Sequence, residues 1–112
     1  MIIKKSERKK HINSPICTAY EYDTGDKDIN IAFIEINGRY PSKGRVTNKI
    51  CKELVFVVKG KGKIEIDNKK FLIDEGDMAL ILPNQRYFFE GNLAVIAACN
   101  PTWYPEQHVE CD

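Results

Sequence analysis

Glu53 is the carboxylate whose sequence surroundings most suggest proton chemistry. It begins an apolar run, and the alternation of a β-strand places it on one face with Val55 and Val57. A carboxylate on an apolar face must be protonated, hydrogen-bonded or paired with a cation, and burial raises its pKa. A raised pKa suits a general base that removes a proton from a carbon next to a carbonyl. The alternatives are solvent exposure or a structural salt bridge to a basic residue, namely Arg45, Lys49 or Arg86.

Aromatic and polar side chains elsewhere in the chain are candidates for a ligand site around this carboxylate. Flat rings with polar tips stack on sugars and other planar ligands, while amide and guanidinium groups supply hydrogen bonds. The same rings could instead complete a small hydrophobic core. We expect a small polar ligand, carbohydrate-like in character. The expected ligand-binding residues are Tyr40, Asn48, Glu53, Arg86, Phe88 and Trp103.

Histidine and cysteine are sparse and scattered. The two histidines, His11 and His108, lie near the termini, and the four cysteines contain no C-x-x-C pair, which argues against a zinc knuckle or a redox motif. Free thiols are expected in a reducing compartment, although an even number permits two disulfides in an oxidising one. A metal site built from Cys51, Glu53 and His108 is a minor alternative.

Length and charge bound the organisation of the chain. Its 112 residues are enough for a single domain, with a basic N-terminal arm at residues 1–14 and an irregular tail at residues 100–112. A formal net charge of +1, from 17 basic and 16 acidic residues, argues against nucleic acid as the main partner. No signal peptide and no apolar run of membrane-spanning length is evident, so we expect a cytoplasmic location and no membrane partner.

The spacing of apolar runs and turn residues predicts an all-β chain. Short runs rich in Val, Ile, Leu and Phe alternate with Gly, Asn and Asp, and the gaps are too short for parallel crossovers, so the strands should form antiparallel hairpins. Eight to ten short strands are expected, with loops at 11–14, 39–44 and 100–112. Turns are expected at 37–38, 60–62, 67–68, 75–77 and 91–92, and the clearest strands at 17–22, 29–36, 54–59, 63–67, 70–74, 78–82, 86–90 and 93–99.

The order of five landmarks resembles the two motifs of the cupin superfamily, which are Gly44, Glu53, Gly60, Gly76-Asp77 and Pro83. The resemblance implies an antiparallel jelly-roll β-barrel. In the family, three histidines and this glutamate hold a transition metal. The motif places Val46 and Asn48, or Thr47 and Lys49, at the first two histidine positions and Phe88 at the third. We therefore expect no metal at the usual position and no cofactor.

Two functions of different classes follow from these observations. The first is a metal-free cupin that binds a small molecule in the barrel. The second is an enzyme similar to sugar or sugar-phosphate isomerases and epimerases, with Glu53 as the general base. A metal-dependent dioxygenase ranks lower, because the histidines are missing. Strands that are apolar on both faces need covering, so a homodimer is expected, with its interface at the N-terminal arm or residues 29–36.

Overall fold

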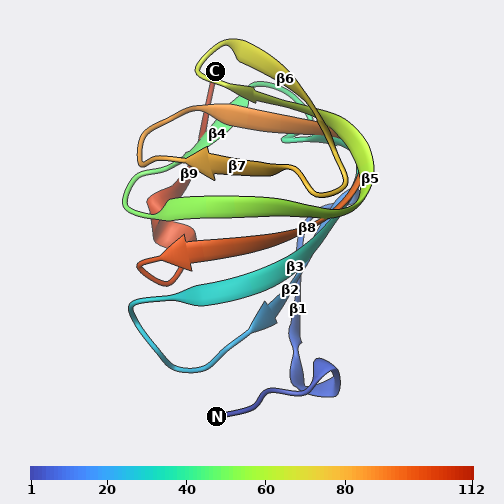
Figure 1. Ribbon diagram of the computed structural model, residues 1–112. Helices are drawn as coiled ribbons and strands as arrows, with labels where there is room; N and C mark the ends of the chain where they lie inside the picture. The colour runs from blue at the N-terminus through green and yellow to red at the C-terminus, as the bar shows by residue number, and fades with distance from the viewer.

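The computed structural model describes all 112 residues and contains nine antiparallel strands and two 3-10 turns. The N-terminal residues extend from one end of the molecule, and the C-terminus lies at the opposite end (Figure 1). No helix is long and apolar enough to cross a membrane. The elements in chain order are η1 (Lys5–Glu7), β1 (Lys9–Ser14), β2 (Cys17–Tyr22), β3 (Asn30–Tyr40), β4 (Arg45–Asn48), β5 (Lys52–Ile66), β6 (Lys69–Asp74), β7 (Met78–Ile81), β8 (Tyr87–Asn100), η2 (Pro105–Gln107) and β9 (His108–Cys111).

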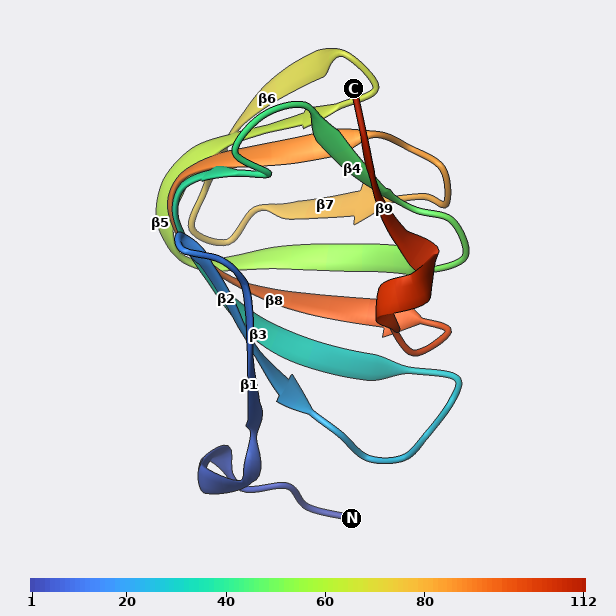
Figure 2. The same cartoon turned by 180° about the vertical axis from the view of Figure 1, so that it is seen from behind.

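Three long strands, β3, β5 and β8, form the frame of a curled sheet. Strand β8 pairs with β3 along one edge and with β5 along the other, and the strands bend sharply at one side of the molecule (Figure 1). Strands β6 and β7 pair with the two halves of β5, and β1 and β2 extend the sheet beyond β3. The pair β4–β9, preceded by η2, lies across the open side of the curl (Figure 2). The all-β antiparallel class expected from the sequence is confirmed.

The two faces of β5 differ as strict alternation predicts. Glu53, Val55 and Val57 are buried inside the curl, whereas Leu54 and Phe56 on the opposite face are 43% and 47% exposed. The inner apolar residues of β5 and β8 belong to one core cluster. Glu53 therefore points into an interior that is otherwise built largely from hydrocarbon.

Two glycine-rich segments that were expected to be turns lie inside long strands. Residues 60–62 are part of β5 and residues 91–92 are part of β8, so each pair of predicted strands is one continuous strand. Gly62 and Gly91 face each other in the ladder, and a Cβ added to Gly91 would lie 2.7 Å from the Cα of Gly62. The glycines therefore allow two bent strands to approach closely, and the chain does not reverse there.

Three further expectations were wrong in detail. The predicted turn at 37–38 is part of β3, which continues to Tyr40. The predicted loop at 11–14 belongs to β1, so the basic arm ends in an edge strand paired with β2. The tail at 100–112 is not irregular throughout, because it forms η2 and then β9, which pairs with β4 at Asn48 and His108.

Candidate functional site

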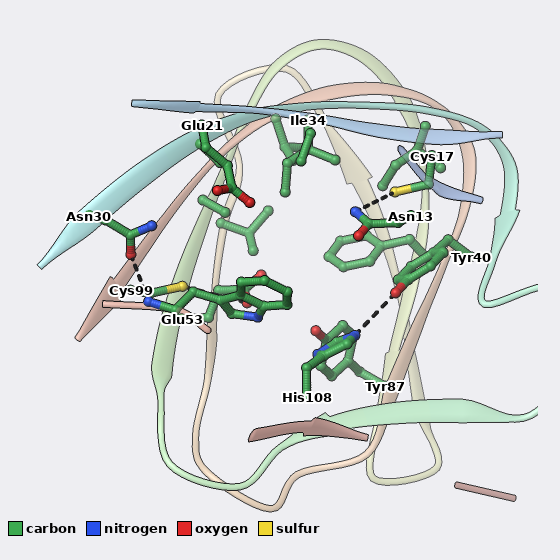
Figure 3. A pocket seen from close by; sticks show the side chains of 18 residues that line it. Asn13, Cys17, Glu21, Asn30, Ile34, Tyr40, Glu53, Tyr87, Cys99 and His108 are labelled. Atoms are coloured by element: carbon green, nitrogen blue, oxygen red, sulfur yellow. Dashed lines mark hydrogen bonds between the residues drawn. The ribbon is translucent and has the colours of Figure 1, made fainter. Parts of the chain in front are cut away.

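A cavity of about 70 Å³ lies inside the barrel, and its lining combines small apolar residues with a few polar groups (Figure 3). Small side chains on β2, β3 and β8 leave the space open, namely Ala19, Ala32 and Ala97. Because roughly 10–15 Å³ suffices for one water molecule, the cavity has room for several waters or for one compact polar part of a larger ligand. Half-buried residues such as Asn30 and Trp103 connect it with the surface.

Glu53 supplies a buried carboxylate to this cavity. Its side chain is inside the barrel, with the residue only 6% exposed, and its Oε1 accepts a 3.0 Å hydrogen bond from Nδ2 of Asn48. The Cys99 thiol approaches the same oxygen at 3.8 Å. Its other oxygen, Oε2, accepts no hydrogen bond from the protein. Burial raises the pKa of Glu53, and the hydrogen bonds from Asn48 and Cys99 only partly oppose this effect.

The salt-bridge alternative for Glu53 was wrong. Arg45 instead pairs with the buried carboxylate of Glu65, its Nε lying 2.6 Å from Oε1. Arg86 pairs with Asp112 at the surface, at 2.7 Å. Both arginines are thus paired with other acids, and Lys49 is exposed and makes no salt bridge. Glu53 is therefore held by neutral donors alone.

A chain of hydrogen bonds connects Glu53 to the C-terminal segment. Oδ1 of Asn48 accepts from Nε2 of Gln107 and from Nδ1 of His108, both at 2.9 Å. Nε2 of His108 in turn lies 3.1 Å from the hydroxyl of Tyr40 (Figure 3). Strands β3, β4, β5 and β9 thus each contribute one member of a continuous polar network within the barrel.

The contacts fix the direction of every donor in this network. Oε1 of Gln107 accepts from the backbone N–H groups of Ile50 and Cys51, at 3.2 and 3.1 Å, so its Nε2 must be the donor to Asn48. Oδ1 of Asn48 is then the acceptor, and its Nδ2 donates to Glu53. His108 must carry its proton on Nδ1, which leaves Nε2 to accept from the Tyr40 hydroxyl.

The shifted pKa values keep His108 and Tyr40 of this network uncharged at neutral pH. Burial lowers the pKa of His108 to about 4 and raises the pKa of Tyr40 well above its ordinary value of 10.0. A neutral imidazole agrees with the tautomer required by its two partners. At neutral pH the site therefore contains an uncharged histidine and an uncharged phenol beside a carboxyl group whose charged form is disfavoured.

Trp103 closes one wall of the cavity. Its backbone N–H donates to Oδ1 of Asn30 at 3.0 Å, which ties the C-terminal segment to the start of β3. Its indole ring centroid lies 5.5 Å from that of His108 and 6.3 Å from that of His11. The ring is half-buried and offers a flat apolar surface next to the polar network.

The six predicted ligand-binding residues either line the cavity, support a lining residue from behind or lie outside the cavity. Tyr40, Glu53 and Trp103 line the cavity, and Asn48 lies behind Glu53 as its hydrogen-bond partner. Phe88 is buried elsewhere, with the Arg39 guanidinium 3.9 Å from its ring centroid.

Phe88 and Arg86 are therefore not part of this cavity. The reason for Phe88 is strand parity, because its neighbours Tyr87 and Phe89 on β8 point inward. Arg86 lies in the turn before β8, where its side chain reaches the C-terminal residue.

Several lining residues were missed by sequence reasoning. Glu21 on β2 lines the cavity, as do the thiols of Cys17 and Cys99. Gln107 is buried and supports Asn48. The alternation of residues 17–22 was the signal that could have placed Glu21 on the inner face, whereas nothing local indicated Gln107.

The donor set does not fit the transition metal that the cupin resemblance implies. At the motif positions Val46 belongs to the hydrophobic core, and the amide of Asn48 is engaged on both sides. No group of three or more His, Cys, Asp or Glu side chains is arranged to hold a metal ion.

The alternative metal site is not assembled either. The thiol of Cys51 is directed to the Thr102 carbonyl oxygen at 3.9 Å, away from the cavity lining. Both ring nitrogens of His108 are engaged by protein groups. Of Cys51, Glu53 and His108, only Glu53 therefore presents to the cavity a ligand atom without a protein partner.

Comparisons with known proteins place the fold. No protein-family model and no curated protein matches the sequence. Among solved structures, a variant of Streptomyces PAC13 with uridine superposes with a TM-score of 0.88, at 14% identity, over 99% of this chain and 89% of that chain. PAC13 is a nucleoside dehydratase.

Two other solved structures are similar to this chain. Ectoine synthase from P. lautus gives a TM-score of 0.75 at 16% identity, over 100% of this chain and 91% of that chain. KdgF from Halomonas sp. gives 0.73 at 14% identity, over 92% and 94%. These are cupin-fold proteins, and the likeness confirms a cupin-type antiparallel jelly-roll β-barrel.

Proposed function

We propose that this protein binds a small polar ligand, carbohydrate-like in character, in the barrel cavity, with Glu53 in direct contact with it. One observation carries the proposal: a buried carboxylate faces the cavity with one oxygen that accepts no protein hydrogen bond. This oxygen is not among the fully buried side-chain atoms without a partner, so it is open to a donor that enters the cavity. A ligand hydroxyl would supply that donor.

The rest of the cavity suits a ligand of this kind. Trp103 offers a face for stacking, and Tyr40 and His108 present a neutral polar edge beside it. The similar PAC13 structures contain uridine, whose ribose is a carbohydrate. Ribose, uridine and other nucleosides are therefore the first probes to test.

Titration of the protein with these probes tests the proposal, with Trp103 fluorescence and calorimetry as readouts. Glu53→Gln should weaken binding about tenfold or more, because the single Gln oxygen keeps the hydrogen bond from Asn48 and its NH2 group then meets the ligand donor in place of Oε2. Arg86→Gln is a matched control, since Arg86 is exposed and paired with Asp112. Equal affinities of wild type and Glu53→Gln for a ligand that binds would contradict direct contact.

A second candidate function is proton transfer by Glu53. Its raised pKa brings this carboxyl towards the range useful for general acid and base catalysis near neutral pH. Isomerisation or epimerisation of a sugar, and dehydration of a nucleoside, each require removal of a carbon-bound proton. Incubation of ligands in D2O followed by NMR would detect such exchange. Catalysis predicts that Glu53→Gln abolishes exchange while leaving affinity largely intact.

We propose that neither function needs a metal. The donor set described above supports this, because one carboxylate and an engaged histidine make a poor transition-metal site. Metal analysis of the purified protein provides the test. A stoichiometric transition metal that is lost in Glu53→Gln would overturn the proposal and return dioxygenase chemistry to consideration.

We also propose that the chain forms a homodimer. The outer face of the sheet is apolar, with Leu54, Phe56, Leu80 and Ile96 between 37% and 47% exposed. The ladder places these residues side by side on β7, β5 and β8, so we propose the interface there and not at the N-terminal arm or residues 29–36 expected from the sequence. Sedimentation at micromolar concentration should give the mass of a dimer, and charged substitution at Phe56 should shift it towards the monomer.

A further inference from the structure

The cavity lining contains acidic side chains but no fixed positive charge. Two carboxylates, from Glu21 and Glu53, line it, and no lysine or arginine does. The remaining lining residues are apolar, aromatic, amide or thiol side chains and the neutral His108. A ligand that enters therefore meets acids and no fixed cation.

Glu53 is a buried acidic side chain with one oxygen open to the cavity. It is 6% exposed, and its Oε2 accepts no hydrogen bond from the protein although it belongs to the cavity wall. No cation lies in the cavity lining to stabilise a negative charge on Glu53.

Glu21 occupies the outer part of the same space. It is half-buried on β2, and Figure 3 shows its carboxylate pointing into the cavity. Across the sheet it is aligned with Ala32 on β3 and Ala97 on β8, whose small side chains leave the space in front of it free. The cation closest to it in the ladder, Lys9, is 3.1 Å from Asp23 and does not line the cavity.

We propose that the cavity selects unphosphorylated ligands and that Glu21 is the specificity-determining residue that keeps phosphorylated ones out. The inference rests on the proposed small-molecule function and names its ligand class: neutral, rich in hydroxyl or N–H donors, and without a phosphate. A nucleoside or a free sugar fits this description. A nucleotide or a sugar phosphate does not.

The chemistry of recognition explains the choice. A phosphate monoester carries a charge of about −1.5 to −2 at neutral pH and is normally bound by arginine, lysine or converging N–H groups. Here its entry would bring the phosphate towards the Glu21 carboxylate, with no lysine or arginine in the lining to neutralise it. A hydroxyl group instead donates to a carboxylate. Glu21 therefore repels a phosphate, whereas both carboxyl groups can accept hydrogen bonds from a polyol.

Paired ligands provide the first test. Wild type should bind uridine roughly tenfold or more tightly than uridine monophosphate, and ribose more tightly than ribose 5-phosphate. Glu21→Gln should narrow that ratio and Glu21→Lys should narrow it further or reverse it. Glu35→Gln is the matched control, because Glu35 is an exposed carboxylate on β3 outside the cavity lining. Equal or tighter binding of the monophosphate by wild type would overturn the proposal.

A second test measures the potential of the cavity without any ligand. Ala32→Cys, in a background in which the two cavity thiols and Cys111 are removed (Cys17→Ala, Cys99→Ala and Cys111→Ser), places a single reactive thiol beside Glu21 on the neighbouring strand. This thiol should react about tenfold faster with a cationic methanethiosulfonate than with an anionic one of similar size. The preference should fall when Glu21→Gln is added and stay the same with Glu35→Gln.

The two tests separate the failure of this inference from that of the proposed function. If neither uridine nor ribose binds, the ligand proposal fails, while a cationic preference of the Ala32→Cys thiol that depends on Glu21 still supports selection against anions. If the thiol shows no preference, or one independent of Glu21, the inference is overturned even when a ligand binds.

Discussion

His108 gives the prediction with the most direct magnitude. Its ring is held between Asn48 and Tyr40 in the neutral form, and burial lowers its pKa from 6.5 to about 4. Between these values the unfolded chain binds a proton that the folded chain rejects. The free energy of unfolding must therefore fall as the pH falls from 6.5 towards 4, and the stabilisation is fully present only above 6.5.

The size of this effect follows from the two pKa values. Integrating the difference in bound protons from neutral pH down to about pH 4 gives a loss of about 3 kcal/mol from His108 alone. Single domains have total stabilities of about 5–15 kcal/mol, so the loss is large enough to measure. It should appear as a clear shift of the unfolding midpoint.

Urea unfolding followed by the fluorescence of Trp103, the single tryptophan, measures this loss. Wild type is compared with His108→Asn, in which the amide nitrogen can still donate to Asn48 but cannot titrate. The stability advantage of wild type over the variant should shrink by about 3 kcal/mol between neutral pH and about pH 4. The difference between the two proteins cancels the titration of the surface carboxylates.

His11→Asn is the control for this measurement, because His11 is exposed and should show no such pH dependence relative to wild type. NMR titration of the His108 ring gives an independent check. Parallel pH profiles of wild type and His108→Asn, or a His108 pKa near 6.5, would refute the assignment of a neutral, buried imidazole.

Three more substitutions test other parts of the structure. Glu53→Gln should be more stable than wild type at about pH 8 and should lose that advantage towards pH 4.5. The reason is that the folded-state pKa of Glu53 is raised, so the free energy of unfolding of wild type falls as the pH rises through the shifted range. Urea unfolding in which the advantage of the variant grows as the pH falls would contradict this. Gln107→Ala leaves two backbone N–H groups without their acceptor and removes one of the two donors to the Asn48 oxygen. It should cost about 2–4 kcal/mol, against less than about 1 for Gln85→Ala, whose side chain accepts from one backbone N–H group in a turn. Gly62→Ala should cost about 3 kcal/mol or more, because its Cβ would overlap the backbone of β8, and a melting temperature close to that of wild type would show that the two strands can separate.

The faces of β5 could be predicted from the sequence, but the course of the strand could not. The period of two is local information, and it assigned Glu53 and Leu54 to opposite faces correctly. The function of the glycines at 60–62 depends on what lies against them. Gly62 is paired with Gly91 on β8. Without knowledge of that partner strand, glycines at these positions indicate a turn.

The candidate site was half predictable for a similar reason. Glu53 stood out because its charge interrupts an apolar face. Its support could not be found locally, since Gln107 and His108 are 59 and 60 residues away from Asn48 in the sequence. Phe88 was one residue away from the inward-facing Tyr87, and an error of one position along a strand moves a side chain to the opposite face.

The position of Asn48 between Glu53 and His108 governs how protons can travel. A carboxamide neither releases nor accepts a proton at ordinary pH, and this one is locked in orientation by Gln107. A charge on Glu53 can polarise the hydrogen bonds as far as His108, but no proton can be transferred through the Asn48 amide. Any proton that Glu53 gains or gives up must therefore be exchanged with the contents of the barrel, and none passes to His108 or Tyr40 through Asn48.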